Sequence, residues 1–597
     1  MPTMTNILLV YPEVPANTFW SLTHALKFIN KKSALPPLGL ITVAALMPAG
    51  LNLRLVDMNI EPLREKDIQW ADAVFVSAMI VQKASLEKVI KACRQWQTPV
   101  VAGGPYPTSS WSQIQGVDHF VLGEVETTLG TFFDDYAKGK ARRVYLPAGH
   151  PSLDATPLPR FDLLDRRAYG SMSVQYSRGC PFHCEFCDIW SMFGNRPRVK
   201  PAAGLVAELS ALHELGWRGN VFVVDDNFIG NRRRVKSELL PALIAWQRQN
   251  GRPFTFYTEA SINLAEDKAL LAGMREAGFN QVFIGIETPS RACLAETGKT
   301  QNLNTDLHKA VHTIQRHGLE VMGGFILGFD SDSDDIFDRQ IAFIQETGIV
   351  KAMIGLLNAL PGTRLYHRLA AEGRLLGGTS GNNTHETRTN FATRMDPETL
   401  RQGYLRVLAT LYDYRLKNYF DRCNRLLDRI ENSAFFQRRI TFTEIKAGLM
   451  SLVRQPFTPY GGQYLKFLAR NLLRNKHIIG EAMVLAIEGH HFHLITQQGL
   501  KAARIDRILD DACRSLTDIL ERCKSQTAAN SREAMEWLKG LWSQNQVRLD
   551  QVAAQINTLH RDFRIEMLRR HAQASAHLNE LSRVVVRTAA SADPGRH

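Results

Sequence analysis

Strand-like and helix-like patterns alternate in two separate stretches of the chain, and this alternation constrains the fold more than any other feature. In residues 1–140 the strand patterns are NILLV, LRLVD, ADAVFVSAM, TPVVAGG and HFVLGE, with helical patterns between them. Such alternation predicts an open parallel α/β sheet, whose ligands lie at the carboxyl ends of the strands. The residues at these ends, and so the candidate binding residues, are Asp57, Ser77, Gly103, Gly104, Gly123 and Glu124.

The second stretch covers residues 171–370. Six strand patterns appear there, from SVQYSRG to AMIGLLNALPG, and they predict a partial (βα)6 barrel with its chemistry in the loops after the strands. The segment 141–170, with HPSLDATPLPRFDLLD, has too little apolar periodicity for an element of its own and is expected to be a linker. After residue 370 the strand patterns fade, and helical periodicity dominates beyond Pro397.

Three cysteines, Cys180, Cys184 and Cys187, follow the first barrel strand at Cys-x3-Cys-x2-Cys spacing. Three thiolates on one loop can hold three irons of a 4Fe-4S cube and leave the fourth iron open for S-adenosylmethionine (SAM). The alternative is zinc, which needs a fourth ligand at short spacing, and His183 between two cysteines is awkward for that role. The other cysteines are expected to be core or helix-surface residues, namely Cys93, Cys293, Cys423, Cys513 and Cys523.

The loop YSRGCPFHCEFCDIWSMFG, with Trp190 and Phe193 after the cysteines, resembles the signature of the radical SAM superfamily. The resemblance implies that SAM lies along the carboxyl edges of the later barrel strands. Carboxylates there would suit its ribose and cationic sulfonium, and glycines would allow backbone approach to adenine. The implied SAM-binding residues are Asp225, Asp226, Asn227, Glu259, Ser261, Gly285, Glu287, Gly323, Gly324, Pro361, Gly362 and Thr363.

The segments LPPLGL, VAGGPYPT and VLGEVE resemble the flavodoxin-like cobalamin-binding domain of cobalamin-dependent radical SAM enzymes. This resemblance extends to about residue 430 and includes a DUF4070-like segment, 371–430, shared with hopanoid C-2 methylases. Methionine-synthase-like domains carry Asp-x-His-x-x-Gly, whereas Asp57, Met58 and Asn59 stand at the strand end here. The resemblance therefore implies cobalamin with its dimethylbenzimidazole tail displaced and no protein imidazole on cobalt. A domain that keeps the fold without binding cobalamin is the alternative.

The resemblance implies an enzyme that cleaves SAM reductively and, using methylcobalamin, methylates an unactivated carbon of an apolar or lipid-like substrate. A flavodoxin or ferredoxin would supply electrons. One alternative is a radical oxidation or cyclisation, as in magnesium-protoporphyrin ester cyclases. An alternative of another class is a non-catalytic cobalamin or iron-sulfur sensor.

The net charge is concentrated in the last third of the chain. Residues 1–400 hold 41 Lys/Arg against 40 Asp/Glu, and residues 401–597 hold 31 against 19, so this basic region has either an anionic partner or a solvated helical face. Within the basic helical region 431–597, QYLKFLARNLLRNKHI and RDFRIEMLRRH combine cations with apolar residues at helical spacing, which favours peripheral membrane contact, although packing against the barrel gives the same pattern. No nucleic-acid-binding signature is present, and nucleic acid is not an expected partner.

The start of the chain lacks a signal-peptide pattern, and no apolar run is long enough to span a bilayer. Clustered rather than paired cysteines favour a reducing compartment. We therefore expect a cytoplasmic protein, peripheral on the inner membrane surface if the membrane interpretation holds. The tail SADPGRH is expected to be disordered.

Overall fold

The computed structural model describes residues 4–430, 442–474, 478–525 and 532–591. The chain divides into two compact units, Met1–His493 and Leu494–His597. Both α/β domains lie in the first unit, and the second unit is helical. Apart from Ser591, the tail SADPGRH lies outside the described residues.

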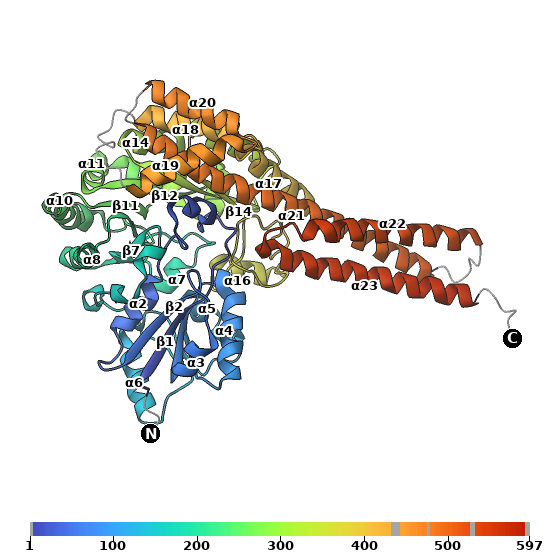
Figure 1. The fold of residues 1–597 in the computed structure, drawn as a ribbon, viewed down its shortest axis with the longest axis horizontal. Helices are drawn as coiled ribbons and strands as arrows, with labels where there is room; N and C mark the ends of the chain where they lie inside the picture. Colours follow the sequence, from blue (N-terminus) through green and yellow to red (C-terminus); the bar gives the residue numbers. More distant parts are fainter. Residues whose placement is uncertain (1–3, 431–441, 475–477, 526–531, 592–597) are drawn as a thin grey trace. The chain divides into compact units, whose positions relative to one another are not determined.

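The first sheet is parallel and has the strand order β2-β1-β3-β4-β5-β6 (Figure 1). Its strands are β1 (Asn6–Tyr11), β2 (Asn52–Asp57), β3 (Ala73–Ser77), β4 (Val100–Gly103), β5 (His119–Val121) and β6 (Val144–Tyr145). Both faces are covered, so the central β1 is apolar on both sides: Leu8 and Val10 face one core, and Ile7 and Leu9 the other. The predicted flavodoxin-like domain is confirmed.

Helices cover the two faces of this sheet. The first core includes side chains of α3 (Glu65–Trp70), α4 (Lys83–Gln95) and α5 (Pro105–Ser110). The second includes those of α2 (Leu38–Ala45) and α6 (Leu129–Ala137). This arrangement leaves the carboxyl edge of the sheet available for a ligand.

The segment 141–170 differs from the prediction that it forms no element. Val144 and Tyr145 form β6, which pairs with β5 and extends the sheet, and three short 3-10 turns follow at Leu153–Ala155, Phe161–Leu163 and Arg166–Ala168. Two residues are too few for a recognisable sequence pattern, and the pairing depends on the neighbouring strand.

The second sheet is also parallel, with the order β14-β13-β12-β11-β10-β7. Its strands are β7 (Met172–Val174), β10 (Gly219–Val223), β11 (Phe254–Glu259), β12 (Phe279–Glu287), β13 (Glu320–Leu327) and β14 (Ala352–Leu356). Helices connect successive strands, so the predicted six-step partial barrel is confirmed. The helices are α8 (Ala202–Glu214), α10 (Leu240–Gln249), α11 (Lys268–Ala277), α14 (Leu307–Arg316) and α15 (Ile336–Thr347). A short antiparallel pair, β8 (Ser177–Arg178) and β9 (Arg198–Val199), brackets the cysteine loop.

The remainder of the described chain is mainly helical, as predicted. Helices α17 (Pro397–Leu411) and α18 (Lys417–Ile430) pack on α15, and α18 also contacts α14. They are followed by α19 (Phe442–Arg454), the 3-10 turn η11 (Gln455–Phe457), α20 (Gly461–Arg474) and α21 (Ile479–Ser525). In the second unit the end of α21, α22 (Arg532–Ile556) and α23 (Arg561–Ser591) share an apolar core. None of the described helices has the length and apolar character needed to cross a bilayer.

The loop between β1 and α2 contacts residues that are distant in sequence. The ring centroid of Phe19 lies 5.4 Å from that of His385 and 6.0 Å from that of Phe492, and Phe28 lies 5.4 Å from His490 on α21. Burial lowers the pKa of His490 to about 4, so its ring packs as a neutral aromatic at pH 7. Part of the first domain is therefore enclosed by elements that follow the barrel.

A buried ionic cluster joins α21 to the barrel. The Lys351 Nζ, on a residue 3% exposed, lies 2.8 Å from Glu488 Oε1 on α21 and 3.5 Å from Glu320 Oε2 on β13. Burial acts to lower the pKa of Lys351, but the two carboxylates outweigh it and the pKa is raised. The lysine therefore stays charged and neutralises two largely buried carboxylates.

Replacing Lys351 with Met should destabilise the first unit, because it leaves two carboxylates buried without a cation. Removing one partner of a buried ion pair costs about 3–5 kcal/mol. The measurement is the urea midpoint of the full chain by circular dichroism. Lys417→Met is the matched control, since its partner Asp421 is exposed and exposed pairs contribute at most about 1 kcal/mol. Equal shifts for the two variants would contradict the assignment.

Candidate functional site: a cysteine loop beside a cavity at two sheet edges

The three clustered cysteines lie on one loop between β8 and α7 (Ile189–Phe193). None of them forms a disulfide. Burial raises the pKa of each thiol, and Asp188 and the neighbouring thiols of Cys184 and Cys180 add to the rise at Cys187. The loop thus gathers three free thiols in a shielded place, where a bound metal cluster would favour their thiolate forms.

The glycine before the first cysteine, Gly179, allows the cysteine loop to close. Gly179, with φ 90°, lies so close to the end of α7 that a Cβ there would sit 2.8 Å from the carbonyl oxygen of Gly194 and 2.9 Å from that of Phe193. The backbone N–H of Cys180 donates to the same Gly194 oxygen at 3.3 Å. A side chain at position 179 would therefore push the first cysteine away from the loop.

Glu185, between the second and third cysteines, fixes the middle of the loop. Its backbone N–H donates to Thr297 O at 2.9 Å, and its carbonyl accepts from Leu365 N on α16 (Arg364–Ala371) at 3.0 Å. Its carboxylate accepts from Arg368 Nε at 2.7 Å. The loop is therefore held by two segments from the far side of the barrel.

The three polar residues after β10 support the same loop. Asp225 accepts from Tyr176 N at 2.8 Å and from Ser177 Oγ at 2.6 Å, and Asp226 accepts from Gly179 N at 2.8 Å. The Asn227 side-chain amide lies 3.9 Å from Cys180 Sγ and 3.2 Å from Ser261 Oγ. The structure thus brings Asp225, Asp226, Asn227 and Ser261 together at the strand ends, where most of their polar atoms bind other groups of the protein. Their contact with SAM stays a prediction.

Glu259, at the end of β11, differs from these residues because its carboxylate has no hydrogen-bond partner among the described residues. Burial raises its pKa to about 8, and repulsion from Asp226 and Asp225 adds to the rise. Burial likewise raises the pKa of Asp226 to about 7. A cation placed among these carboxyls would relieve both their repulsion and their protonation.

Glu287 and Lys299 form a buried ion pair near the cysteine loop. Glu287 lies at a bulge of β12 with φ 62°, and a Cβ on Gly285 would meet both charged groups. Burial acts to lower the pKa of Lys299, but Glu287 and the Cys184 thiol raise it overall. Its Nζ also lies 5.8 Å from the ring centroid of Phe186, so a fixed positive charge adjoins the cysteines.

The other predicted barrel residues have more varied surroundings. Gly323 and Gly324 leave room for the rings of Phe325 and Phe283 respectively. Thr363 is buried, and its hydroxyl caps α16 by accepting from Tyr366 N at 3.1 Å. Pro361 and Gly362 line a cavity.

In the first sheet the glycines make the strand ends fit tightly together. A Cβ on Gly103 would lie 2.7 Å from Val121 O, and one on Gly104 would collide with Ser77 Oγ. Thr108 Oγ1 donates to Gly104 O at 2.7 Å and accepts from Gly123 N at 2.9 Å. Ser77, Gly103, Gly104 and Gly123 thus form one compact edge.

Asp57 and Asn59 do not line the cavity described below. Asp57 is fully buried and accepts from Tyr169 OH at 2.8 Å and from Asn59 N at 2.9 Å. Asn59 Oδ1 accepts from Val14 N at 2.8 Å. These side chains join the end of β2 to the loop after β1 and to the linker.

A cavity of about 470 Å³ opens between the carboxyl edges of the two sheets. The first domain contributes Thr108 on α5 and Gly123 and Glu124 after β5, the linker contributes His150, and the barrel domain contributes Asp188 and Gly362. Residues from both predicted cofactor sites therefore share one cavity.

Glu124 anchors this cavity through a cluster of charges. Its carboxylate accepts from Arg178 at 2.8 Å and from Arg198 at 2.6 Å, and His150 Nδ1 lies 2.8 Å from its Oε1. Burial acts to raise the pKa of Glu124, but hydrogen bonds from Arg198 and Arg178 outweigh it and the pKa is lowered. Arg178 directly precedes the cysteine loop, so this cluster fixes the loop against the first sheet.

The residues present fit the two predicted groups. Three free thiols on one loop match the donors of a three-cysteine 4Fe-4S cluster, whose cysteines each bind a different iron. Within the described residues no three His, Cys, Asp or Glu side chains are placed to hold a single metal ion. The glycine edge and the hydroxyls of Thr108 and Ser109 beside the cavity suit a polar cofactor that lies close to backbone.

Sequence reasoning missed several residues of this site: Arg178, Arg198, His150, Glu185 and Lys299. For Arg178 and Glu185, proximity to the cysteines was the available signal. Arg198, His150 and Lys299 lie 11 to 112 positions from the nearest cluster cysteine. Only the fold brings them close to their partners, and a lone charged residue gives no sequence pattern.

Replacing Glu185 with Ala should loosen the cysteine loop without removing a thiol, because the loop then loses its ion pair with Arg368. We expect less iron per chain after anaerobic reconstitution and gel filtration than in the unmodified protein. Glu372→Ala is the matched control: Glu372 also contacts Arg368 but is more exposed. An unchanged iron content in Glu185→Ala would show that the backbone contacts of the loop suffice.

Three family models match successive parts of the chain: the B12 binding domain at residues 28–133, the Radical SAM superfamily at 174–344, and a domain of unknown function, DUF4070, at 363–504. The first two domains imply cobalamin, SAM and a 4Fe-4S cluster. An uncharacterized methyltransferase of Synechocystis sp. is 44% identical over 421 residues, which are 70% of this chain and 78% of that protein.

A hopanoid C-2 methylase of Rhodopseudomonas palustris is 31% identical over 514 residues, 83% of this chain and 94% of that protein. An anaerobic magnesium-protoporphyrin IX monomethyl ester cyclase of Synechocystis sp. is more distant, 23% identical over 51% of this chain and 67% of that protein. The fold resembles that of the cobalamin-dependent radical enzyme OxsB, with a TM-score of 0.54, 15% identity and coverage of 85% and 81%. The chain therefore belongs to the cobalamin-dependent radical SAM methyltransferases that combine a B12-binding, a radical SAM and a DUF4070 domain.

Proposed function

We propose that this protein methylates an unactivated carbon of an apolar, lipid-like small molecule. The observation that carries the proposal is the cavity itself, because Gly123 and Glu124 at a strand end of the B12-binding domain and Asp188, the residue after Cys187, line it together. When bound, the cluster would supply the electron that cleaves SAM, and cobalamin would supply the methyl group. The hopanoid C-2 methylase supports the lipid-like character of the substrate.

On the barrel side, Cys180, Cys184 and Cys187 would hold the cluster and Glu259 would face the cationic part of SAM. Glu259 suits that role because its carboxyl has no partner among the described residues and lies beside Asp226. Gly285 and the buried Glu287–Lys299 ion pair would shape the adjoining wall. Asp225, Asp226 and Asn227 would position the loop rather than touch the substrate.

On the cobalamin side, Ser77, Gly103, Gly104 and Gly123 would receive the cofactor along the carboxyl edge of the first sheet. Glu124 would act through its partners, since both arginines and His150 point their donors at it. Asp57 and Asn59 would support this edge from beneath, through the loop after β1.

Two partners follow from this chemistry. A flavodoxin or ferredoxin would deliver single electrons, and a lipid-like substrate would be collected at the inner surface of the membrane. The basic residues beyond position 400 support contact with an anionic surface.

The proposed reaction is tested by replacing Cys180, Cys184 and Cys187 together with Ala. Loss of the three thiolates should abolish cluster absorbance and reductive SAM cleavage, whereas Cys93→Ala should leave both intact. The assay is anaerobic incubation with SAM, cobalamin and extract of cells that lack the protein, followed by mass spectrometry. A gain of one CH2 unit supports methylation; loss of hydrogen or gain of oxygen would instead indicate oxidation or cyclisation. No SAM cleavage by the reconstituted protein would indicate a sensor.

Cobalamin should bind with no imidazole or benzimidazole nitrogen on cobalt, because Asn59 stands where related domains carry histidine. Electron paramagnetic resonance of the cob(II)alamin form should therefore show cobalt lines without nitrogen superhyperfine splitting. Splitting would contradict the proposal, and His150→Ala would then identify the source, since His150 is a histidine that lines the cavity. Splitting that persists in that variant would come from the cofactor tail.

A further inference from the structure

The helices α19 and α20 and the turn η11 between them expose an unusual amount of apolar surface. Nine of the 20 large apolar side chains that are exposed in the described residues lie within residues 442–473. Phe457 is 89% exposed, Leu473 87% and Phe442 82%. Folded proteins seldom leave such a concentration without a partner. We call this surface the docking face; it consists of Phe442, Ile445, Leu449, Leu452, Val453, Phe457, Leu465, Leu472 and Leu473.

On α19 the docking face is a narrow stripe. At about 100° per residue, its five α19 members fall within an arc of about 100°. Ala447 and Ser451, on the opposite side, are buried, and the helix packs there on residues 27–29 of the first domain. Lys446 borders the stripe, whereas the acidic Glu444 projects away from it. The exposed stripe is therefore a second apolar face, separate from the one that serves the core.

On α20 an apolar stripe and a basic stripe lie side by side. Leu465, Leu472 and Leu473 fall within an arc of about 100°, and Lys466, Arg470 and Arg474 follow within the next 100° or so. The third side, with Tyr464 and Phe467, is buried. This order of apolar, basic and buried faces is the one expected of a helix that lies in a membrane interface.

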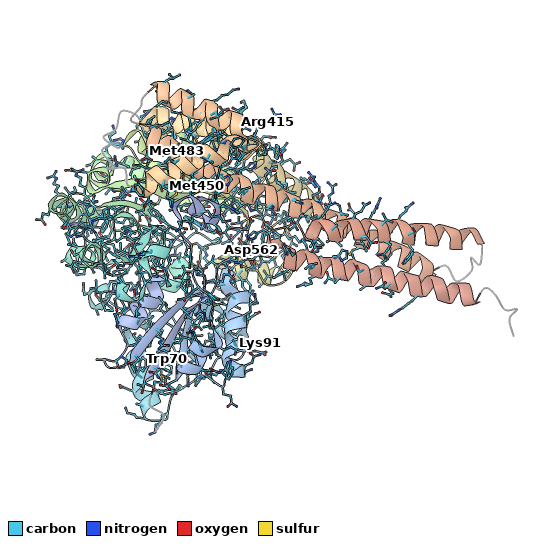
Figure 2. The ribbon with its side chains drawn as sticks, viewed as in Figure 1. Trp70, Lys91, Arg415, Met450, Met483 and Asp562 are labelled. Carbon is cyan, nitrogen blue, oxygen red and sulfur yellow. The ribbon has the colours of Figure 1, made fainter. Side chains whose placement is uncertain are left out.

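Buried contacts hold the docking face in place. Ser451 Oγ on α19 lies 2.9 Å from Tyr464 OH on α20, and Gln455 Nε2 donates to Ser451 Oγ at 2.7 Å. The Tyr464 hydroxyl also lies 3.7 Å from Met483 Sδ on α21, labelled with Met450 of α19 in Figure 2. Both helices are thus anchored to the unit that carries the site, and exposure of their outer residues does not come from a loose element.

The charge around the docking face selects one kind of partner. Residues 442–474 contain five cations, Lys446, Arg454, Lys466, Arg470 and Arg474, and one acid, Glu444. Arg470 and Arg474 pair with Asp428, whereas Lys446 and Lys466 are exposed and form no ion pair with the described residues. An apolar stripe bordered by lysines matches acyl chains beneath anionic headgroups.

We propose that the docking face of α19, η11 and α20 inserts into the surface of an anionic lipid bilayer and holds the first unit there. This deepens the membrane contact proposed above. The biological role of docking rests on the proposed function, but docking itself can be tested without substrate. It assigns the contact to residues 442–473 rather than to RDFRIEMLRRH on α23. The apolar side chains would insert into the acyl-chain region, and the lysines would make the protein prefer anionic lipids.

The test compares three proteins in vesicle flotation, using pure phosphatidylcholine vesicles and vesicles that also contain phosphatidylglycerol. The first is the unmodified full chain. The second carries Ile445→Asp, Leu449→Asp and Phe457→Asp, which alter exposed positions and leave the buried contacts intact. The third carries Ile565→Asp and Leu568→Asp, a matched control on exposed apolar residues of α23.

We expect the unmodified protein and the control to float with anionic vesicles at low salt, and the docking-face variant to partition at least tenfold more weakly. Binding should weaken as salt rises, because the screening length falls to about 8 Å at physiological ionic strength and exposed charges farther apart are largely screened. Hydrogen exchange of peptides from 442–474 should slow when anionic vesicles are added. Lys446→Gln with Lys466→Gln should reduce the preference for anionic over neutral vesicles.

Equal flotation of the docking-face variant and the unmodified protein would overturn the proposal, as would loss of binding in the α23 control alone. Sedimentation velocity tests whether a second copy of this chain occupies the docking face instead. The proposal fails if the unmodified protein is a dimer, the docking-face variant is a monomer, and neither binds vesicles. SAM cleavage should be unchanged in the variant. Failure of docking with intact SAM cleavage would leave the methyltransferase proposal standing.

Discussion

One buried carboxylate, that of Glu124, holds the carboxyl edges of the two sheets in a fixed relation. It lies at the end of a strand of the first sheet, yet its oxygens accept hydrogen bonds from Arg178 and Arg198, which flank the cysteine loop of the second sheet. A buried carboxylate is costly without such partners, so the carboxylate of the first domain and the two arginines of the barrel domain stabilise each other. The arrangement of the cavity follows from this pairing, since Glu124 and His150 form part of its wall.

Other protein contacts likewise fix the cysteine loop inside the barrel domain. Asp225, Asp226 and Asn227 fix the start of the cysteine loop, Glu185 fixes its middle through Arg368, and Gly179 leaves room for its closure. Few polar groups near the thiols remain for a ligand, and Glu259 is the clearest of them. A site that must control a radical gains from such rigidity, because reacting atoms have to be held in a narrow range of positions.

Periodicity and spacing in the sequence predicted both parallel sheets, the helical region and the cysteine loop, because these features depend on local patterns. Long-range partners had no such signal. Lys299 and Glu287 are twelve residues apart and His150 and Glu124 twenty-six, and nothing in either segment marks the pair. Likewise Asp57 stood at a strand end like Glu124, but Tyr169 from the linker encloses it, and the linker was itself expected to lack any element. Position at a strand end narrows the choice of residues, whereas burial decides which of them keep free polar atoms.

The contacts of the loop after β1 bear on how such a protein could arise. Three family models match successive pieces of the chain, yet Phe19, which precedes the first piece, and Phe28 at its start contact His385, His490 and Phe492 from the last. Gene fusion can join the three domains, but the fused protein also needs side chains from the first and last domains that pack against each other. Homologues that lack the DUF4070 domain would then need a different, less apolar segment after their first strand. Recombination between family members should keep the segment after β1 together with the DUF4070 domain that covers it.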